Sequence, residues 1–172
     1  DARITKIYEG TNEVNRLLIV GELMKRAFQT KEIAVLPALK KAPLKAVSSL
    51  VSCGCKSIEK RIENLKQLFL LLMGSAGNKL KKDLIDQQEI VMNLSDILTE
   101  IFVLESTFLR SEKAKENKND KAEIFAKITE VQAYDAFENV RKSAREVINA
   151  YTTGLENKMM KKFLNKIGRA HV

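Results

Sequence analysis

The chain has 172 residues, of which 45% are hydrophobic and 30% charged, so it is long enough for a folded domain and is not a disordered tail. Its longest apolar run, residues 68–73, is far shorter than the roughly 20 residues that cross a membrane. Seven glycines and two prolines are too few for the closely spaced turns of a β-sandwich or barrel, so we expect a helical protein. Because the first residue is Asp1 rather than Met, we expect the chain to be a piece of a longer protein.

The first predicted helix covers residues 12–29. Thr11 is its expected N-cap, because a threonine hydroxyl can accept a hydrogen bond from a free amide of the first turn. Residues 30–55 are expected to form a linker that contains two prolines and a short helix at residues 44–54. The expected apolar stripe of the first helix consists of Val14, Leu17, Leu18, Leu23 or Met24, and Phe28.

Two long helices are predicted next, from apolar residues spaced three and four apart. One begins near residue 56 and ends at Gly74 and Gly77, and the other covers residues 80–115. Their expected apolar faces consist of Ile58, Ile62, Leu65, Leu68, Phe69 and Leu72 in the first, and of Leu84, Val91, Leu94, Leu98, Ile101 and Phe108 in the second.

A polar turn at residues 113–120 precedes another predicted long helix, residues 122–151, with Asp120 as its expected cap. Gly154 ends this helix, and residues 155–167 form a last amphipathic helix. Short turns between long helices favour antiparallel neighbours, so the predicted fold is all-α, an up-and-down antiparallel helical bundle. The apolar face of the helix at residues 122–151 is expected to consist of Ile124, Ile128, Val131, Tyr134, Phe137, Ala144 and Ile148.

The formal net charge of +8 is concentrated in residues 31–82, which carry eleven basic and three acidic side chains. Such a segment can meet the phosphates of a nucleic acid, an anionic membrane surface or a phosphorylated ligand. It can also pair with the acidic residues 83–119, and an internally paired or solvated face is the simpler interpretation. No aromatic residues alternate with the lysines, so we expect no nucleic-acid partner.

The predicted bundle contains no recognisable catalytic constellation. Cys53 and Cys55 are too close in sequence for an unstrained disulfide, and the only histidine is His171, so we expect no metal site. Glu105 interrupts an apolar helix face, and we expect its carboxylate to be paired or to lie at the edge of that face.

The N-terminal segment differs from the bundle because Glu9 lies between Tyr8 and Gly10, directly before a predicted helix. An apolar substrate would desolvate this carboxylate and strengthen it as a general base. Gly10 permits close approach to the backbone, and Thr11 with the free amides of the first turn offers a site for an anion or a cofactor oxygen. The residues alone also fit a simple turn followed by a helix cap.

This segment closely resembles the final catalytic stretch of the acyl-CoA dehydrogenase family, whose pattern is R-D-A-x-I-x-x-I-Y/F-E-G-T-x-x-x-x-R-L. That family combines a helical domain, a small β-barrel domain and a C-terminal helical domain that ends in this region. The matching residues are Asp1, Ala2, Arg3, Ile4, Ile7, Tyr8, Glu9, Gly10, Thr11, Arg16 and Leu17.

The resemblance implies that Glu9 is the base that removes the proton α to the thioester carbonyl while the β hydride passes to FAD. Gly10 would line the thioester site, and Thr11, Asn12 and Glu13 would contact FAD. The implied activity is FAD-dependent oxidation of fatty acyl-CoA to trans-2-enoyl-CoA in fatty-acid β-oxidation. Implied partners are acyl-CoA, electron-transfer flavoprotein and a second subunit in a homodimer or homo-oligomer.

The long helical extension resembles that of the very-long-chain type, in which it is associated with dimer formation and membrane-surface attachment. Residues 1–29 would then end the catalytic helical domain, residues 30–55 would be the linker, and residues 56–172 would be the appended bundle. We expect the chain alone to be inactive and to lack FAD, and the complete enzyme to be cytoplasmic in a bacterium or mitochondrial in a eukaryote. The alternative function is a non-enzymatic helical module for oligomerisation or for peripheral membrane contact.

Overall fold

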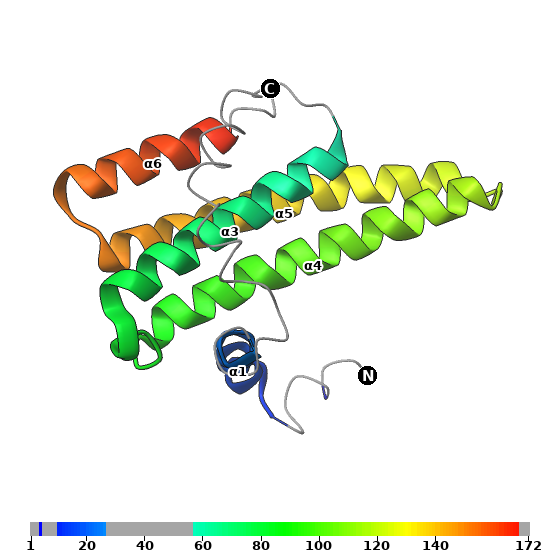
Figure 1. Cartoon of the computed structure of the whole chain (residues 1–172). Coiled ribbons are helices and arrows are strands. Elements are labelled where there is room, and N and C mark those ends of the chain that lie inside the picture. The colour runs from blue at the N-terminus through cyan, green and yellow to red at the C-terminus, as the bar shows by residue number, and fades with distance from the viewer. Residues whose placement is uncertain (1–3, 5–9, 27–56, 169–172) are drawn as a thin grey trace.

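The computed structural model describes residue 4, residues 10–26 and residues 57–168, and these residues contain five α-helices and no strand (Figure 1). The helices are α1 (Asn12–Lys25), α3 (Ile58–Leu80), α4 (Gln88–Glu116), α5 (Ala122–Tyr151) and α6 (Gly154–Gly168), with a 3-10 helix at Lys81–Leu84. The predicted all-α fold class is therefore confirmed. The predicted linker and its short helix lie outside the described residues.

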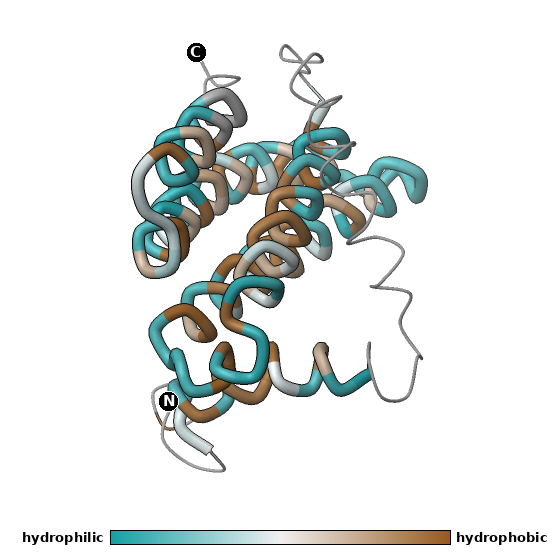
Figure 2. Tube along the Cα trace, turned by 60° about the vertical axis from the view of Figure 1, so that its left-hand side comes forward, coloured by the Kyte–Doolittle hydropathy of each residue, from teal (hydrophilic) through white to brown (hydrophobic). Residues whose placement is uncertain are grey.

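The helices α3, α4 and α5 lie side by side with alternating direction, as an up-and-down bundle requires, and α6 folds back along them (Figure 1). Hydrophobic and hydrophilic residues alternate along each helix, which is the pattern of helices with one buried face (Figure 2). The buried side chains form one cluster to which all five helices contribute. Its most enclosed large members are Leu65, Leu68, Leu72, Leu84, Leu94, Ile97, Leu104, Ile148, Leu164, Val20, Val140 and Val147.

The sequence predicted that α3 ends at Gly74 and Gly77, but the helix continues to Leu80. Met73 and Ala76 are buried in this stretch, so their packing outweighs the cost of about 1 kcal/mol that a glycine adds inside a helix. The chain then passes through the 3-10 helix, and α4 begins at Gln88 rather than at residue 80. The predicted apolar face of α4 is confirmed at Val91, Leu94 and Ile101, which are buried.

The predicted bounds of α5 agree with the structure, but its predicted N-cap does not. The N-cap of α5 is Lys121 rather than Asp120, and the Lys121 amide donates to the Asn119 side-chain oxygen at 2.8 Å. Thr11 is the N-cap of α1, as predicted, but its side chain makes no capping hydrogen bond. Both helix starts are therefore held without the predicted side-chain caps.

The predicted apolar face of α5 is wrong in its first half. Ile124, Ile128, Val131 and Tyr134 are 50–64% exposed. The buried residues of this half are small ones, namely Thr129, Ala133 and Ala136. Small side chains let α5 approach α4 closely, so the bulky residues on the opposite side remain at the surface. In the second half Phe137, Ala144 and Ile148 are buried, as predicted.

The helix α1 crosses beneath α4 as a separate element (Figure 1). Val20 is its one fully buried residue, and Leu17, Leu23 and Met24 pack against the same core. Of the predicted stripe, Val14 and Leu18 are exposed, and Phe28 lies outside the described residues. Within the part of the chain that the structure describes, no helix is long and apolar enough to cross a membrane.

Candidate functional site

The candidate site is the segment that leads into α1, and Gly10 is its best-defined feature. Its φ of +95° lies in the region that favours glycine. The Asn15 side-chain amide donates to the Gly10 carbonyl at 3.0 Å, and a Cβ at Gly10 would lie only 2.9 Å from Asn15 Oδ1. The positive φ therefore favours glycine here, and any side chain at this position would also make Asn15 move. Glu9, the predicted base, lies outside the described residues.

The three residues predicted to contact FAD, Thr11, Asn12 and Glu13, are all exposed at the start of α1. The Thr11 carbonyl accepts the Asn15 amide at 3.0 Å, which closes the first turn. The Thr11 hydroxyl has no hydrogen-bond partner among the described residues. With the first-turn amides, which lack acceptors within the helix, this hydroxyl can bind an anionic or carbonyl oxygen.

One turn further along, α1 is tied to α4 through Arg16. The Arg16 guanidinium donates through Nη2 to Asp96 Oδ2, and the Ser95 hydroxyl donates to the Arg16 carbonyl oxygen. The Arg16 Nε is enclosed and has no partner within the described part of the chain. Both the side chain and the backbone of Arg16 are thus held by consecutive residues of α4.

Two grooves flank this contact. A polar groove of about 640 Å³ runs between α4 and α5 from Arg16, and its walls carry acids and bases together. A second groove of about 470 Å³ lies between α1 and the start of α4, and apolar side chains make up most of its lining. Its apolar lining consists of Leu17, Leu18, Val20, Met24, Ile85 and Val91.

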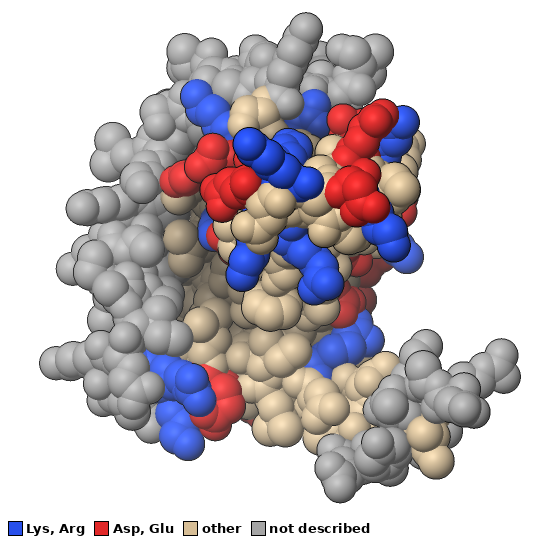
Figure 3. Space-filling model, turned by 90° about the vertical axis from the view of Figure 1, so that its right-hand side faces the viewer, with Lys and Arg blue, Asp and Glu red and all other residues tan. Residues whose placement is uncertain are grey.

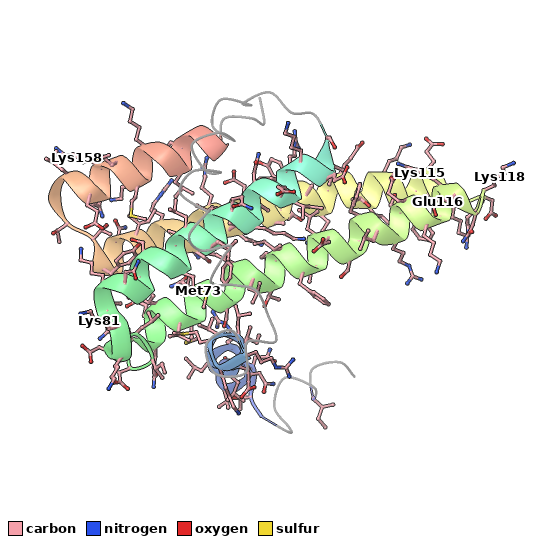
Figure 4. All side chains as sticks on the ribbon, in the orientation of Figure 1. Met73, Lys81, Lys115, Glu116, Lys118 and Lys158 are labelled. Atoms are coloured by element: carbon pink, nitrogen blue, oxygen red, sulfur yellow. The ribbon has the colours of Figure 1, made fainter. Side chains whose placement is uncertain are left out.

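The charged residues of the bundle are mostly mixed rather than separated by sign. At the end of the α4–α5 hairpin, basic and acidic side chains alternate (Figure 3). Lys115, Glu116 and Lys118 lie at this end of the bundle (Figure 4). In the basic segment 31–82, Lys66 pairs with Glu105 at 2.5 Å, and Lys79 pairs with Glu156 at 2.8 Å. The expectation that Glu105 is paired is confirmed.

Within the described ranges, no group of three or more His, Cys, Asp or Glu side chains could hold a metal ion. Cys53, Cys55 and His171 lie outside those ranges.

The residues that the sequence did not single out are Ser95 and Asp96. A signal was present, because Ser95 is a small polar residue between Val91 and Leu98, two residues of the predicted apolar face, and such a residue can mark a close helix contact.

Comparison with known proteins gives consistent matches. Residues 64–166 match the family described as "Acyl-CoA dehydrogenase, C-terminal domain". The chain is 32% identical to a "Probable acyl-CoA dehydrogenase" of Bacillus subtilis (strain 168) over 177 aligned positions, which cover 98% of this chain and 29% of the relative. It is also similar to the crystal structure of acyl-CoA dehydrogenase complexed with FAD from Bacillus anthracis, with a TM-score of 0.82 and 31% identity. That match covers 96% of this chain and 29% of the other. The chain thus spans less than a third of the length of these relatives.

Proposed function

Because this chain belongs to the family of acyl-CoA dehydrogenase C-terminal domains, we propose that it is the C-terminal part of an FAD-dependent acyl-CoA dehydrogenase. The complete enzyme would oxidise fatty acyl-CoA to trans-2-enoyl-CoA in fatty-acid β-oxidation. The observation that carries this proposal is that both matches to dehydrogenases cover nearly the whole chain, at 98% and 96%, rather than the bundle alone.

In this proposal Glu9 is the catalytic base. Its carboxylate removes a proton from Cα of the thioester, and the electron pair of that bond forms the double bond to Cβ as a hydride leaves Cβ. Bound FAD would supply the acceptor for this hydride. A carboxylate can perform this abstraction when it is held within hydrogen-bond reach of the proton. Water must also be excluded around the thioester, which the apolar acyl chain favours.

The geometry at the start of α1 fits the other assigned roles. Gly10 is exposed and has no side chain, so its backbone can approach a thioester closely. Thr11 offers a hydroxyl without a partner in the described part of the chain, and Asn12 and Glu13 stand exposed beside it. These three residues would hold polar groups of FAD, with the first-turn amides as further donors.

The remaining partners follow from the same proposal. Electron-transfer flavoprotein would reoxidise the reduced flavin, and the enzyme would act as a homodimer or homo-oligomer. We expect it in the cytoplasm of a bacterium or in the mitochondrion of a eukaryote. Peripheral contact with a membrane is a further expectation for the basic segment 31–82, since lysines attract anionic lipid headgroups.

A second candidate function is a non-enzymatic helical module for oligomerisation or membrane-surface contact. The exposed apolar side chains on the outer face of α5, Ile124, Ile128 and Val131, favour it, because soluble monomers rarely expose extended apolar patches. The two functions differ in one respect. Only the dehydrogenase requires an intact carboxylate at Glu9.

The test is Glu9→Gln in the complete polypeptide that contains this chain, with Glu22→Gln as the matched control. Glu22 is an exposed acid on α1 that pairs with Lys25. We expect Glu9→Gln to retain FAD and to lose about 10²–10⁴-fold in acyl-CoA dehydrogenation, the usual contribution of a general base. The control should retain the wild-type rate. Full activity in Glu9→Gln would refute the assignment, as would flavin-dependent turnover by the 172-residue chain alone.

A further inference from the structure

We propose that Asp96 and Ser95 of α4 are positioning residues for the active-site segment at the start of α1. This inference rests on the proposed function of that segment. It assigns to the appended bundle a part in placing the catalytic base, in addition to its role as a folded domain.

The two contacts lie close to the candidate site. Arg16 is four residues after Asn12, the first residue of α1, so about 6 Å of helix axis separates the two. Asp96 accepts from the Arg16 guanidinium, and Ser95 donates to the Arg16 carbonyl oxygen. Both contacts therefore act on the half of α1 that adjoins the candidate site.

The two contacts also restrict the orientation of α1. Val20 is 1% exposed and anchors α1 in the core, but apolar packing has little directional preference. Hydrogen bonds require particular angles, and these two act on the side chain and on the backbone of the same residue. Together they restrict both the rotation of α1 about its axis and its sliding along α4.

Burial determines how strongly these contacts act. The Ser95 side chain is fully buried, and the Arg16 and Asp96 side chains are only 31% and 35% exposed. A partly desolvated ion pair is screened less by water than a surface pair. Replacing either partner therefore leaves a poorly solvated group without its partner. This favours a displacement of α1 that brings the group into water.

Asn15 links Arg16 to the motif. Asn15, its neighbour, donates its backbone amide to the Thr11 carbonyl and its side-chain amide to the Gly10 carbonyl, each at 3.0 Å. Gly10 directly follows Glu9 in the chain. A displacement of α1 at Arg16 is consequently transmitted to Gly10 and to the residue that carries the proposed base.

The experiment uses the complete polypeptide, purified with FAD, as the wild type and as Asp96→Asn, Ser95→Ala and Asp135→Asn. Asp135→Asn is the matched control, because Asp135 is an exposed acid on α5 without an ion pair among the described residues. Each protein is measured for kcat and KM with a fatty acyl-CoA, for bound FAD and for its thermal unfolding temperature. Arg16→Gln and the double variant Arg16→Gln/Asp96→Asn complete a double-mutant cycle.

We expect Asp96→Asn to lower kcat about tenfold and Ser95→Ala about threefold, with KM changed less than about twofold, because small misplacements of a catalytic group act mainly on the chemical step. FAD content and unfolding temperature should stay close to those of Asp135→Asn. The double variant should be no slower than Arg16→Gln alone, since both substitutions remove the same contact.

Two results would overturn the positioning role: wild-type kcat in both Asp96→Asn and Ser95→Ala, or a loss of activity that only follows the loss of FAD or of folded protein. These failures are distinct from a failure of the proposed function. If the proposed function itself were wrong, the wild-type enzyme would not oxidise acyl-CoA, or Glu9→Gln would remain active.

Discussion

Lys66 on α3 and Glu105 on α4 form an ion pair across the bundle, with 2.5 Å between Nζ and Oε1. The pair joins the basic segment 31–82 to the acidic segment 83–119, as the internally paired interpretation of the charge pattern requires. Both side chains are partly exposed, at 44% and 38%, so water and salt screen the attraction. The pair therefore contributes little to the stability of the fold.

The first prediction concerns the strength of this pair. Glu105→Gln should lower the free energy of unfolding of the chain by only about 0.2–1 kcal/mol, the usual range for exposed pairs. The loss should shrink when urea unfolding is repeated at high salt. Glu130→Gln, at an exposed position on α5, provides the control and should change stability less. A loss that salt does not reduce would contradict the assignment to electrostatics.

The sequence predicted the existence of the long helices well but not all of their ends. Apolar spacing repeats over many turns, whereas an end depends on a few residues. Gly74 and Gly77 indicated an end to α3, but the burial of Met73 and Ala76 carries the helix past them. Local preference therefore gave way to tertiary packing, which a single sequence does not reveal.

The second prediction follows from that observation. Gly77→Ala should raise the free energy of unfolding by up to about 1 kcal/mol, because Gly77 is helical and a Cβ there meets no atom within 4 Å. Gly154→Ala is the matched control with the opposite sign, since its φ of +60° costs an alanine about 1–2 kcal/mol. Chemical denaturation of both variants measures the two changes in the free energy of unfolding. Destabilisation by Gly77→Ala would mean that α3 does not continue as a helix there.

The candidate site was predictable only in part, and for a related reason. Residues 9–13 form a contiguous motif, so a resemblance over a short stretch is enough to name them. Ser95 and Asp96 act on Arg16 from about 80 residues away, and that proximity exists only once α1 packs on α4. The prediction of the buried face of α5 was wrong for a similar reason, since spacing cannot tell which of two apolar sides meets a neighbouring helix.

The third prediction tests the face of α5 that meets α4. Ala136 is fully buried, and α5 packs against α4, so Ala136→Leu should lower the free energy of unfolding by about 1–3 kcal/mol through overpacking. Ala150→Leu makes the same change at an exposed position of α5 and should stay within about 0.5 kcal/mol of the wild type. Equal effects of the two substitutions would show that α5 does not present its small residues to α4.

The fourth prediction concerns pH. Burial raises the pKa of the Tyr151 phenol above its usual value of 10.0, a hydrogen bond with Ser75 opposes this, and the Glu156 carboxylate adds to it. Above about pH 10 the unfolded chain releases this proton while the folded chain retains it, so the contribution of Tyr151 to stability is complete below that pH and is lost as the pH rises.

Urea unfolding between about pH 8 and pH 11 measures this effect, because the slope of stability against pH counts the protons released on unfolding. Tyr151→Phe should make the alkaline decline shallower than in the wild type. Tyr134→Phe, at an exposed position on the same helix, should leave the decline unchanged. If Tyr151→Phe declines as steeply as the wild type, the Tyr151 phenol ionises as readily in the folded chain as in the unfolded one, and burial does not hold its proton.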